Sequence, residues 1–441
     1  MSKKILLGSV AAASLLGACK WTEFDDLADS TWVESTQKPD SDSANWGVAV
    51  ARIKRTGEGG RLAVIGASQA LYSEVVFSPT GGSSVADGAF NLNKQFGIGN
   101  VEAQPIHLAD PATDENVLIT RSGSASIAVI RGIAGTIDVK QVFEPERPDA
   151  ATFLVAPSID GAAGVQISQP IVAQDDKVFG AFYAPPENPF RQVKCRLTDA
   201  NGAVNVRGLG AVRGLDPADA TKASDDLVVL SSTGKLYIYD GGVFNGARGG
   251  AACPDATPGD DDNTGTALPF PDYAQGFDLG LTFTPVAGAQ ILVFDRQFAL
   301  IQAHDDSGKS YLGLVDLAAA ANVSSPDTRD GLKTIATAVV GTTRYVAAGY
   351  PRQLVDGTEA GQVMLFKVET ARGGIATTPE VTLHDAQLEN NQAFGRALTF
   401  MPFSCTNEPC DNNNVLVVGA DNELFTYFRL DPIYGDRRAG R

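Results

Sequence analysis

Histidines are the first place to look for general acid–base or metal chemistry, and this chain has only three. His107, His304 and His384 stand far apart, each beside apolar or loop residues. The chain also lacks His-Glu-x-x-His, Gly-x-Ser-x-Gly and a complete phosphate-binding P-loop. Its 52 Asp and Glu residues make carboxylate pairs unavoidable, so no particular pair indicates glycoside hydrolysis. We therefore predict no catalytic residue.

Cysteines offer a second kind of chemistry. Four of the five lie in the body of the chain, at Cys195, Cys253, Cys405 and Cys410. An even number is typical of disulfides formed in an oxidising compartment. We expect Cys405 to pair with Cys410 across a short loop, which leaves Cys195 with Cys253; this pairing is preferred among the three possible ones for loop proximity. A zinc site is the alternative, although two cysteines separated by four residues, without nearby histidines, are poorly spaced for zinc.

One acidic loop resembles the start of an EF-hand calcium loop. Asp260, Asp262 and Thr264 place oxygen-bearing side chains at alternate positions before a glycine. The twelfth position of such a loop is Pro271 rather than a bidentate glutamate. The three residues are therefore an incomplete calcium candidate, with a solvated acidic loop as the alternative. No other cofactor is predicted.

The chain is strongly acidic, with a formal net charge of −17. Such a surface repels the phosphate backbone of nucleic acids and keeps a secreted protein soluble. We therefore exclude nucleic acid as a partner.

The N-terminus predicts the compartment. Lys3 and Lys4 precede the apolar segment Ile5–Leu16, whose 12 residues are too few to span a bilayer but suit a secretory signal. The segment ends in Leu16-Gly17-Ala18-Cys19, which resembles the lipobox of bacterial lipoproteins. The resemblance implies removal of residues 1–18 and lipidation of the Cys19 thiol, so that the protein is anchored to a membrane. Inner-membrane lipoproteins carry Asp directly after the lipidated cysteine. Lys20 occupies that position here, which favours anchoring in the outer membrane of the cell envelope.

The rest of the chain divides into three parts. Residues 19–45 are polar and predict a flexible tether, with a short strand at Thr31–Glu34. Residues 46–430 show no break in composition and predict one domain, followed by a tail at residues 431–441.

Seven short apolar runs recur through this domain. They are Leu62–Ala67, Val117–Thr120, Phe153–Pro157, Leu227–Leu230, Ile291–Phe294, Tyr345–Gly349 and Val415–Ala420. Their mean spacing is about 59 residues, and such continuous runs are typical of strands buried on both faces. Turn residues and a second strand follow several of them, as at 231–240, 361–368 and 420–428, which predicts hairpins. Leu317–Asn322 is the one short helical candidate. The pattern predicts an all-β β-propeller of seven blades, each a four-stranded antiparallel sheet.

The repeats resemble the FG-GAP repeats of integrin α-subunit propellers. Phe394-Gly395 followed by Val415–Ala420 carries the best copy, and Trp46-Gly47 followed by Leu62–Ala67 the next. Phe96-Gly97 is a third clear aromatic-Gly opening, and Phe277-Asp278 is a looser one. Integrin-type repeats often hold calcium in loops of alternating aspartates. Remnants of such loops are at 114–116, 225–226 and 411–414.

Three functions fit these predictions. The first is a membrane-anchored binding or scaffold protein for a protein or glycan partner, with binding surfaces in the long insertions Ala184–Ala203 and Gly241–Pro271. The second is an extracytoplasmic hydrolase or lyase acting on polysaccharide. The third is an envelope assembly factor, because Gly234–Asp240 resembles the closing strand of quinoprotein-type repeats found in such lipoproteins. The first is preferred because no catalytic set can be assembled from the sequence.

Overall fold

The chain folds into β-strands joined by turns. A computed structural model describes residues 32–37, 46–53, 61–66, 71–77, 83–85, 90–91, 101–106, 116–121, 127–133, 136–143, 152–155, 158–160, 166–168, 171–183, 190–213, 225–239, 266–268, 276–324, 329–340, 343–370, 374–385, 387–401 and 415–428. No helix occurs in these ranges, which confirms the all-β prediction for them. The predicted signal peptide, Cys19 and the tail at 431–441 lie outside the described residues.

Antiparallel sheets follow one another along the N-terminal half. The first holds β2 (Trp46–Ile53), β3 (Arg61–Gly66), β4 (Leu71–Phe77), β5 (Ser83–Val85) and β6 (Phe90–Asn91). The next holds β7 (Val101–Ile106), β8 (Asn116–Arg121), β9 (Ile127–Ile133) and β10 (Thr136–Phe143). A third holds β11 (Thr152–Val155), β14 (Ile171–Gln174), β15 (Lys177–Tyr183), β16 (Phe190–Asp199) and β17 (Gly202–Ala203), with β21 (Thr266–Leu268) parallel to β16. β12 (Ser158–Asp160) and β13 (Gln166–Ser168) form a separate hairpin.

The C-terminal half continues the same scheme. One eight-stranded sheet joins β18 (Val206–Arg213), β19 (Asp225–Ser231), β20 (Lys235–Tyr239) and β22 (Phe277–Asp278) to β23 (Ala289–Phe294), β24 (Phe298–His304), β25 (Ser310–Asp316) and β26 (Ala321–Ser324). The next sheet holds β27 (Thr334–Val340), β28 (Thr343–Tyr350), β31 (Gln362–Glu369), β32 (Gly374–Ile375) and β33 (Val381–Leu383). The connection from β28 to β31 forms a separate hairpin of β29 (Leu354–Val355) and β30 (Thr358–Glu359). The last sheet holds β34 (Ala397–Met401), β35 (Val415–Ala420), β36 (Glu423–Phe428) and β1 (Trp32–Gln37).

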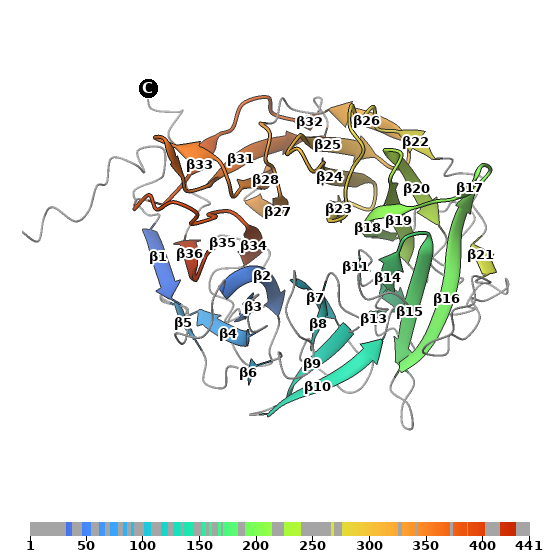
Figure 1. Cartoon of the computed structure of the whole chain (residues 1–441), viewed down its shortest axis with the longest axis horizontal. Helices are drawn as coiled ribbons and strands as arrows, with labels where there is room; N and C mark the ends of the chain where they lie inside the picture. Colours follow the sequence, from blue (N-terminus) through green and yellow to red (C-terminus); the bar gives the residue numbers. More distant parts are fainter. Residues whose placement is uncertain are drawn as a thin grey trace, which may run out of the picture.

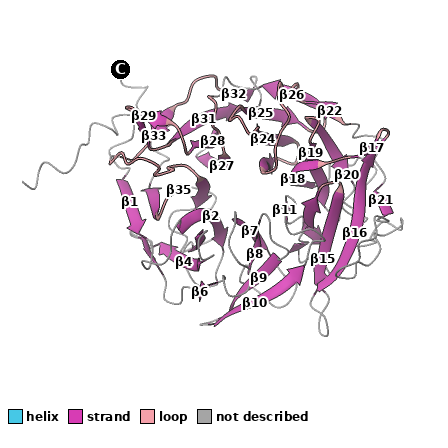
Figure 2. Cartoon of the chain, viewed as in Figure 1, coloured by secondary structure: helices cyan, strands magenta, loops and turns pink. Residues whose placement is uncertain are grey.

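The sheets are arranged in a ring (Figures 1 and 2). Its inner side is formed by seven strands, β2, β7, β11, β18, β23, β27 and β34; we call these the first strands, and each of them with the strands that follow it in its sheet a unit. Each of these strands lies next to the following one, and β34 lies next to β2. The first strands therefore form a closed cycle.

The two ends of the described chain meet in one sheet. β1 pairs antiparallel with β36 over six residues, from Trp32 opposite Phe428 to Gln37 opposite Glu423. The strand expected at Thr31–Glu34 is thus present, and these residues of the predicted 19–45 tether belong to a sheet. The pairing covers the outer edge of β36, which would otherwise expose unpaired backbone groups.

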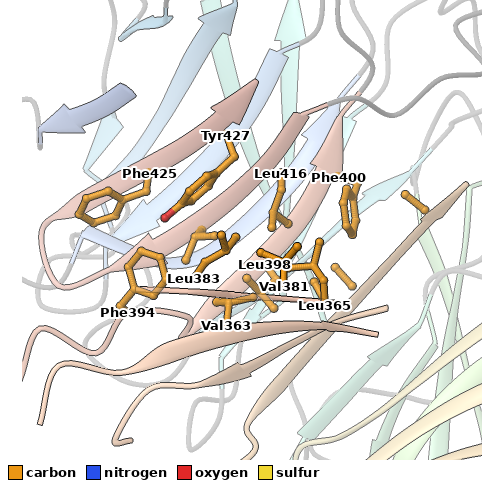
Figure 3. Close-up of a cluster of buried hydrophobic side chains, with 14 of the residues drawn as sticks. Val363, Leu365, Val381, Leu383, Phe394, Leu398, Phe400, Leu416, Phe425 and Tyr427 are labelled. Carbon is orange, nitrogen blue, oxygen red and sulfur yellow. The ribbon is translucent and has the colours of Figure 1, made fainter. Parts of the chain in front are cut away.

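Apolar side chains fill the space between neighbouring sheets. Figure 3 shows one such interface, where Val363 and Leu383 face Phe394, which lies just before β34, and Phe425 and Tyr427 of β36. The ring of Phe394 is completely buried and contacts Phe425 edge-on at 5.1 Å between centroids. Similar clusters lie at the interfaces on either side, so the sheets that hold β27 to β33 and β34 to β36 are buried on both faces and need continuous apolar strands.

All seven predicted apolar runs are strands, but they do not occupy one equivalent position. Five correspond to the second strand of a unit: β3, β8, β19, β28 and β35. Phe153–Pro157 and Ile291–Phe294 correspond instead to first strands, β11 and β23. Because inner strands are also covered on both faces, apolar continuity does not separate a first strand from a second one.

Two further expectations were wrong. The helical candidate Leu317–Asn322 is a turn that leads into β26, because Asp316 Oδ1 accepts a hydrogen bond from Ala319 N and Ala320 has a φ of 48°. The expected insertion Ala184–Ala203 contains the ten-residue strand β16. Within Gly241–Pro271 the described residues form β21, which pairs with β16, so this part of the segment belongs to a sheet rather than to a free loop.

Candidate functional site

One face of the ring brings together two sets of turns. Within a unit, a turn joins the second strand to the third. At three places this turn contacts the segment that leads into the following unit. Gly234 O accepts a hydrogen bond from Leu279 N (3.1 Å), Gly308 O from Gly331 N (2.7 Å), and Ala360 O from Phe394 N (2.9 Å). We call this the turn face. Because its segments come from neighbouring units, residues far apart in the sequence meet here.

Glycines hold neighbouring units close together at this face. A Cβ atom added to Gly349 would lie 2.0 Å from the Gly395 carbonyl oxygen, and one added to Gly419 would lie 2.4 Å from the Gly47 carbonyl oxygen. Gly47 and Gly395 both have a φ of 90°, a conformation that side chains other than glycine's rarely adopt. The same glycine-on-glycine contact therefore occurs at two interfaces, one of which joins the two ends of the chain.

A polar cluster lies on the turn face between β24 and β27. Gln302 is fully buried, and its Nε2 donates to Leu332 O at 3.0 Å and lies 3.1 Å from His304 Nδ1. Gln302 Oε1 is buried, and no hydrogen-bond partner for it is found among the described residues. The amide thus fixes the His304 ring to the backbone beside Lys333.

The electrostatic surroundings keep His304 neutral. Burial and the neighbouring Lys333 together lower its pKa to about 4, against the opposing effect of Asp305 and Asp306. Because the Gln302 amide N–H donates to Nδ1, the proton of the neutral ring is on Nε2. His304 can therefore offer one N–H donor to a ligand but does not carry charge at neutral pH.

Lys333 is the charged member of the cluster. Burial and the nearby Arg352 lower the pKa of Lys333, while Asp306 and Asp305 act in the opposite direction. In the described part of the chain neither cation has a carboxylate within 4 Å. Asp305 instead binds its own turn, accepting from the Ser307 hydroxyl (2.8 Å) and from Lys309 N (2.9 Å). The arrangement provides two cations and a neutral N–H donor, which together suit an anionic group.

A second polar group lies on the turn face near β36. Gln392 donates from Nε2 to Asp385, and Arg396 forms an ion pair with Asp421. Glu423 is partly buried there, and burial raises the pKa of its carboxyl group, with Asp385 and Glu389 adding to the rise and a hydrogen bond from Ser35 opposing it. Ser35 belongs to β1, so this group connects the closing strand to the face.

Few of the site residues predicted from the sequence can be located. Cys195 is fully buried in β16 and is disulfide-bonded, with a partner outside the described residues. Cys19, Cys253, Cys405, Cys410, Asp260, Asp262 and Thr264 also lie outside them. Asp226, from an aspartate remnant, is completely buried in β19. Within the described ranges no three His, Cys, Asp or Glu side chains are arranged to hold a metal.

Lys333 and Arg352 belong to no sequence motif, and His304 is an isolated histidine in the sequence. Each follows or precedes an ordinary apolar strand, so no local motif marks it. The cluster exists only because β24 and β27 belong to neighbouring units. No helix in the described part is long and apolar enough to cross a membrane. No protein-family model matches the sequence, and no curated protein matches it.

Proposed function

We propose that this protein is a lipid-anchored, extracytoplasmic binding protein, and that its sheets are the seven four-stranded blades of an FG-GAP-like β-propeller. The observation that carries the fold part of the proposal is the closed cycle of first strands, together with the pairing of β1 with β36. A propeller closes its ring when one blade takes strands from both ends of the chain, which removes free sheet edges.

The glycine contacts support the FG-GAP part of the proposal. In the pairs Gly349–Gly395 and Gly419–Gly47, the second glycine follows Phe394 or Trp46, and both of these rings are completely buried. The aromatic residue fills the space between blades, while the glycine lets the two backbones approach. The contact between the chain ends then has the same construction as an interface within the chain.

The disulfide and the tether support the compartment. A disulfide at a fully buried cysteine is typical of proteins folded in an oxidising compartment such as the periplasm or cell surface. If Cys19 carries the lipid, only residues 20–31 separate it from β1. Those residues span at most about 45 Å when fully extended. The propeller would thus stay within that distance of the membrane.

The turn face supports binding rather than turnover. It displays cations and a hydrogen-bond donor on rigid strand ends, which is how scaffold folds present recognition groups. His304 has its pKa lowered to about 4, so it is a weak base near neutral pH. A protein or glycan held at this face is the proposed partner.

Crosslinking in the producing cells tests this function. A photoreactive amino acid placed at Asp306, which is exposed on the turn face, should capture a specific envelope partner. The matched control has the same amino acid at the exposed Arg296, in the turn between β23 and β24. Equal capture at both positions, or hydrolysis of envelope polysaccharide by the purified protein, would contradict the proposal; the second result would favour an enzyme.

A further inference from the structure

The hairpin β29–β30 extends the turn face next to the cation cluster. A short turn joins Tyr350, at the end of β28, to β29, and Arg352 is exposed in this turn. Leu354 follows two residues later with 61% of its surface exposed, the only large hydrophobic side chain so exposed among the described residues. A cation and an exposed apolar side chain therefore lie side by side on one short segment.

The two strands of this hairpin differ in their surroundings. The β30 side is held by the segment leading to β34, since Asn391 N donates to Glu359 O at 2.8 Å. No strand other than β30 pairs with β29 within the described ranges. An open strand edge accepts an extended peptide through backbone hydrogen bonds, and side chains beside the edge provide selectivity.

The charges select the partner. Burial and the nearby Arg352 disfavour the charge on Lys333, and the pKa of Lys333 stays lowered although Asp306 and Asp305 partly offset these effects, so a further anion beside the two cations would be stabilising. The chain as a whole carries a formal net charge of −17, and here two cations lie close together beside Asp305 and Asp306. Carboxylates bind such a site by charge-assisted hydrogen bonds, and the His304 Nε2–H can add a third donor.

We infer that the cluster of Lys333, Arg352 and His304, together with Leu354 and the open edge of β29, binds an acidic peptide segment of a partner protein in an extended conformation. This inference rests on the proposed binding function and names the class of its partner. An acidic glycan also carries carboxylates, but it has no peptide backbone to pair with a strand edge and little apolar surface to contact an exposed leucine. The apolar residue therefore favours a peptide.

Selection from a random octapeptide library, displayed on phage, tests the inference with the lipidated mature chain in detergent micelles. Peptides enriched on the wild-type chain should combine Asp or Glu with an apolar residue. The affinity of a selected peptide should fall about tenfold for Lys333→Met and for Arg352→Gln, and about fivefold for Leu354→Ser. Added salt should weaken the binding, because partly exposed charges are screened. Arg296→Gln removes an exposed cation elsewhere and should change nothing.

Several results would overturn the inference. These are enrichment of basic or uncharged peptides, or affinities that the three variants leave unchanged while their thermal unfolding matches the wild type. Polygalacturonate binding that depends on Lys333 and Arg352 but not on Leu354 would also overturn it, in favour of a glycan. If cellular crosslinking from the turn face persists in the Lys333→Met, Arg352→Gln double variant, the binding function stands and this site is wrong. Loss of all crosslinking in the wild type would instead refute the binding function itself.

Discussion

The carbonyl oxygen of Gly47 lies 2.4 Å from the point where a Cβ atom on Gly419 would be, so the first and last units of the chain touch through two glycines. The contact between Gly395 and Gly349 repeats this relationship within the chain. The ring therefore closes through the same kind of glycine contact that joins two of its internal units. The last interface uses the same backbone approach as an internal one, and β1 adds a strand to it.

Gly419→Ala should therefore destabilise the fold. Gly419 has no positive φ, so alanine itself is acceptable there, and the cost comes from pushing the two backbones apart. We expect the free energy of unfolding in urea to fall by about 1–3 kcal/mol, and Gly349→Ala to have a similar effect. The control Gly202→Ala tests backbone strain alone, because Gly202 has a φ of 120° with no atom within 4 Å of the added Cβ. An unchanged or increased stability of Gly419→Ala would contradict the close approach.

Glu423→Gln should make the protein more stable at neutral pH. Burial raises the pKa of Glu423 above its ordinary value of 4.5, so the folded chain holds a proton more tightly than the unfolded chain. The free energy of unfolding then falls as pH rises from about 4.5 through the folded pKa. The glutamine variant does not titrate, so its advantage over the wild type should be small below pH 4.5 and should grow above it.

Urea unfolding at a series of pH values measures this difference. Asp356→Asn, in the exposed turn of the β29–β30 hairpin, is the matched control and should run parallel to the wild type. An advantage of Glu423→Gln that is constant with pH would show that packing, rather than ionisation, is responsible.

The sequence predicted the all-β class and the buried strands because a sheet covered on both faces, such as the one that holds β19, demands continuous apolar runs such as Leu227–Leu230. The same cause limited the prediction. Ile291–Phe294 is equally apolar, yet it is a first strand, and only the pairing between strands distinguishes the two positions. The ten-residue strand β16 is hard to predict because its charged residues, which alternate with others, are also typical of a loop.

The candidate site was harder to predict than the fold. The Phe-Gly and Trp-Gly pairs marked Gly395 and Gly47 correctly as special positions, because glycine at a tight approach leaves a local sequence signal. Lys333 leaves no such signal. Its neighbour His304 comes from another unit, and the buried amide of Gln302 that joins the two segments looks in the sequence like an ordinary polar residue within a strand.

The disulfide of Cys195 should join it to Cys253. Non-reducing digestion and mass spectrometry should find one peptide pair containing both cysteines and a second linking Cys405 to Cys410, with no free thiol in the denatured protein. Removing the first bridge by Cys253→Ser should cost about 4 kcal/mol on the loop-entropy model, because it closes a loop of about 58 residues. A bridge from Cys195 to Cys405 or Cys410, or zinc released on denaturation, would contradict this pairing.

A lipid on Cys19 should be what holds the protein at the membrane. The thiol is the attachment point that the lipobox resemblance implies, and acyl chains on it would hold the protein at the membrane. The test compares the natural chain with one whose residues 1–18 are replaced by an ordinary cleavable secretory signal and in which Cys19→Ser removes the thiol. The natural chain should incorporate labelled palmitate and remain with the membranes after a high-salt wash. The variant should incorporate none and appear in the soluble extracytoplasmic fraction, with its thermal unfolding unchanged because β1 begins only at Trp32.

A variant that stayed with the washed membranes would show that another part of the chain, or a membrane-bound partner at the turn face, holds it there. Lys333→Met and Arg352→Gln in the same background would then distinguish these two causes.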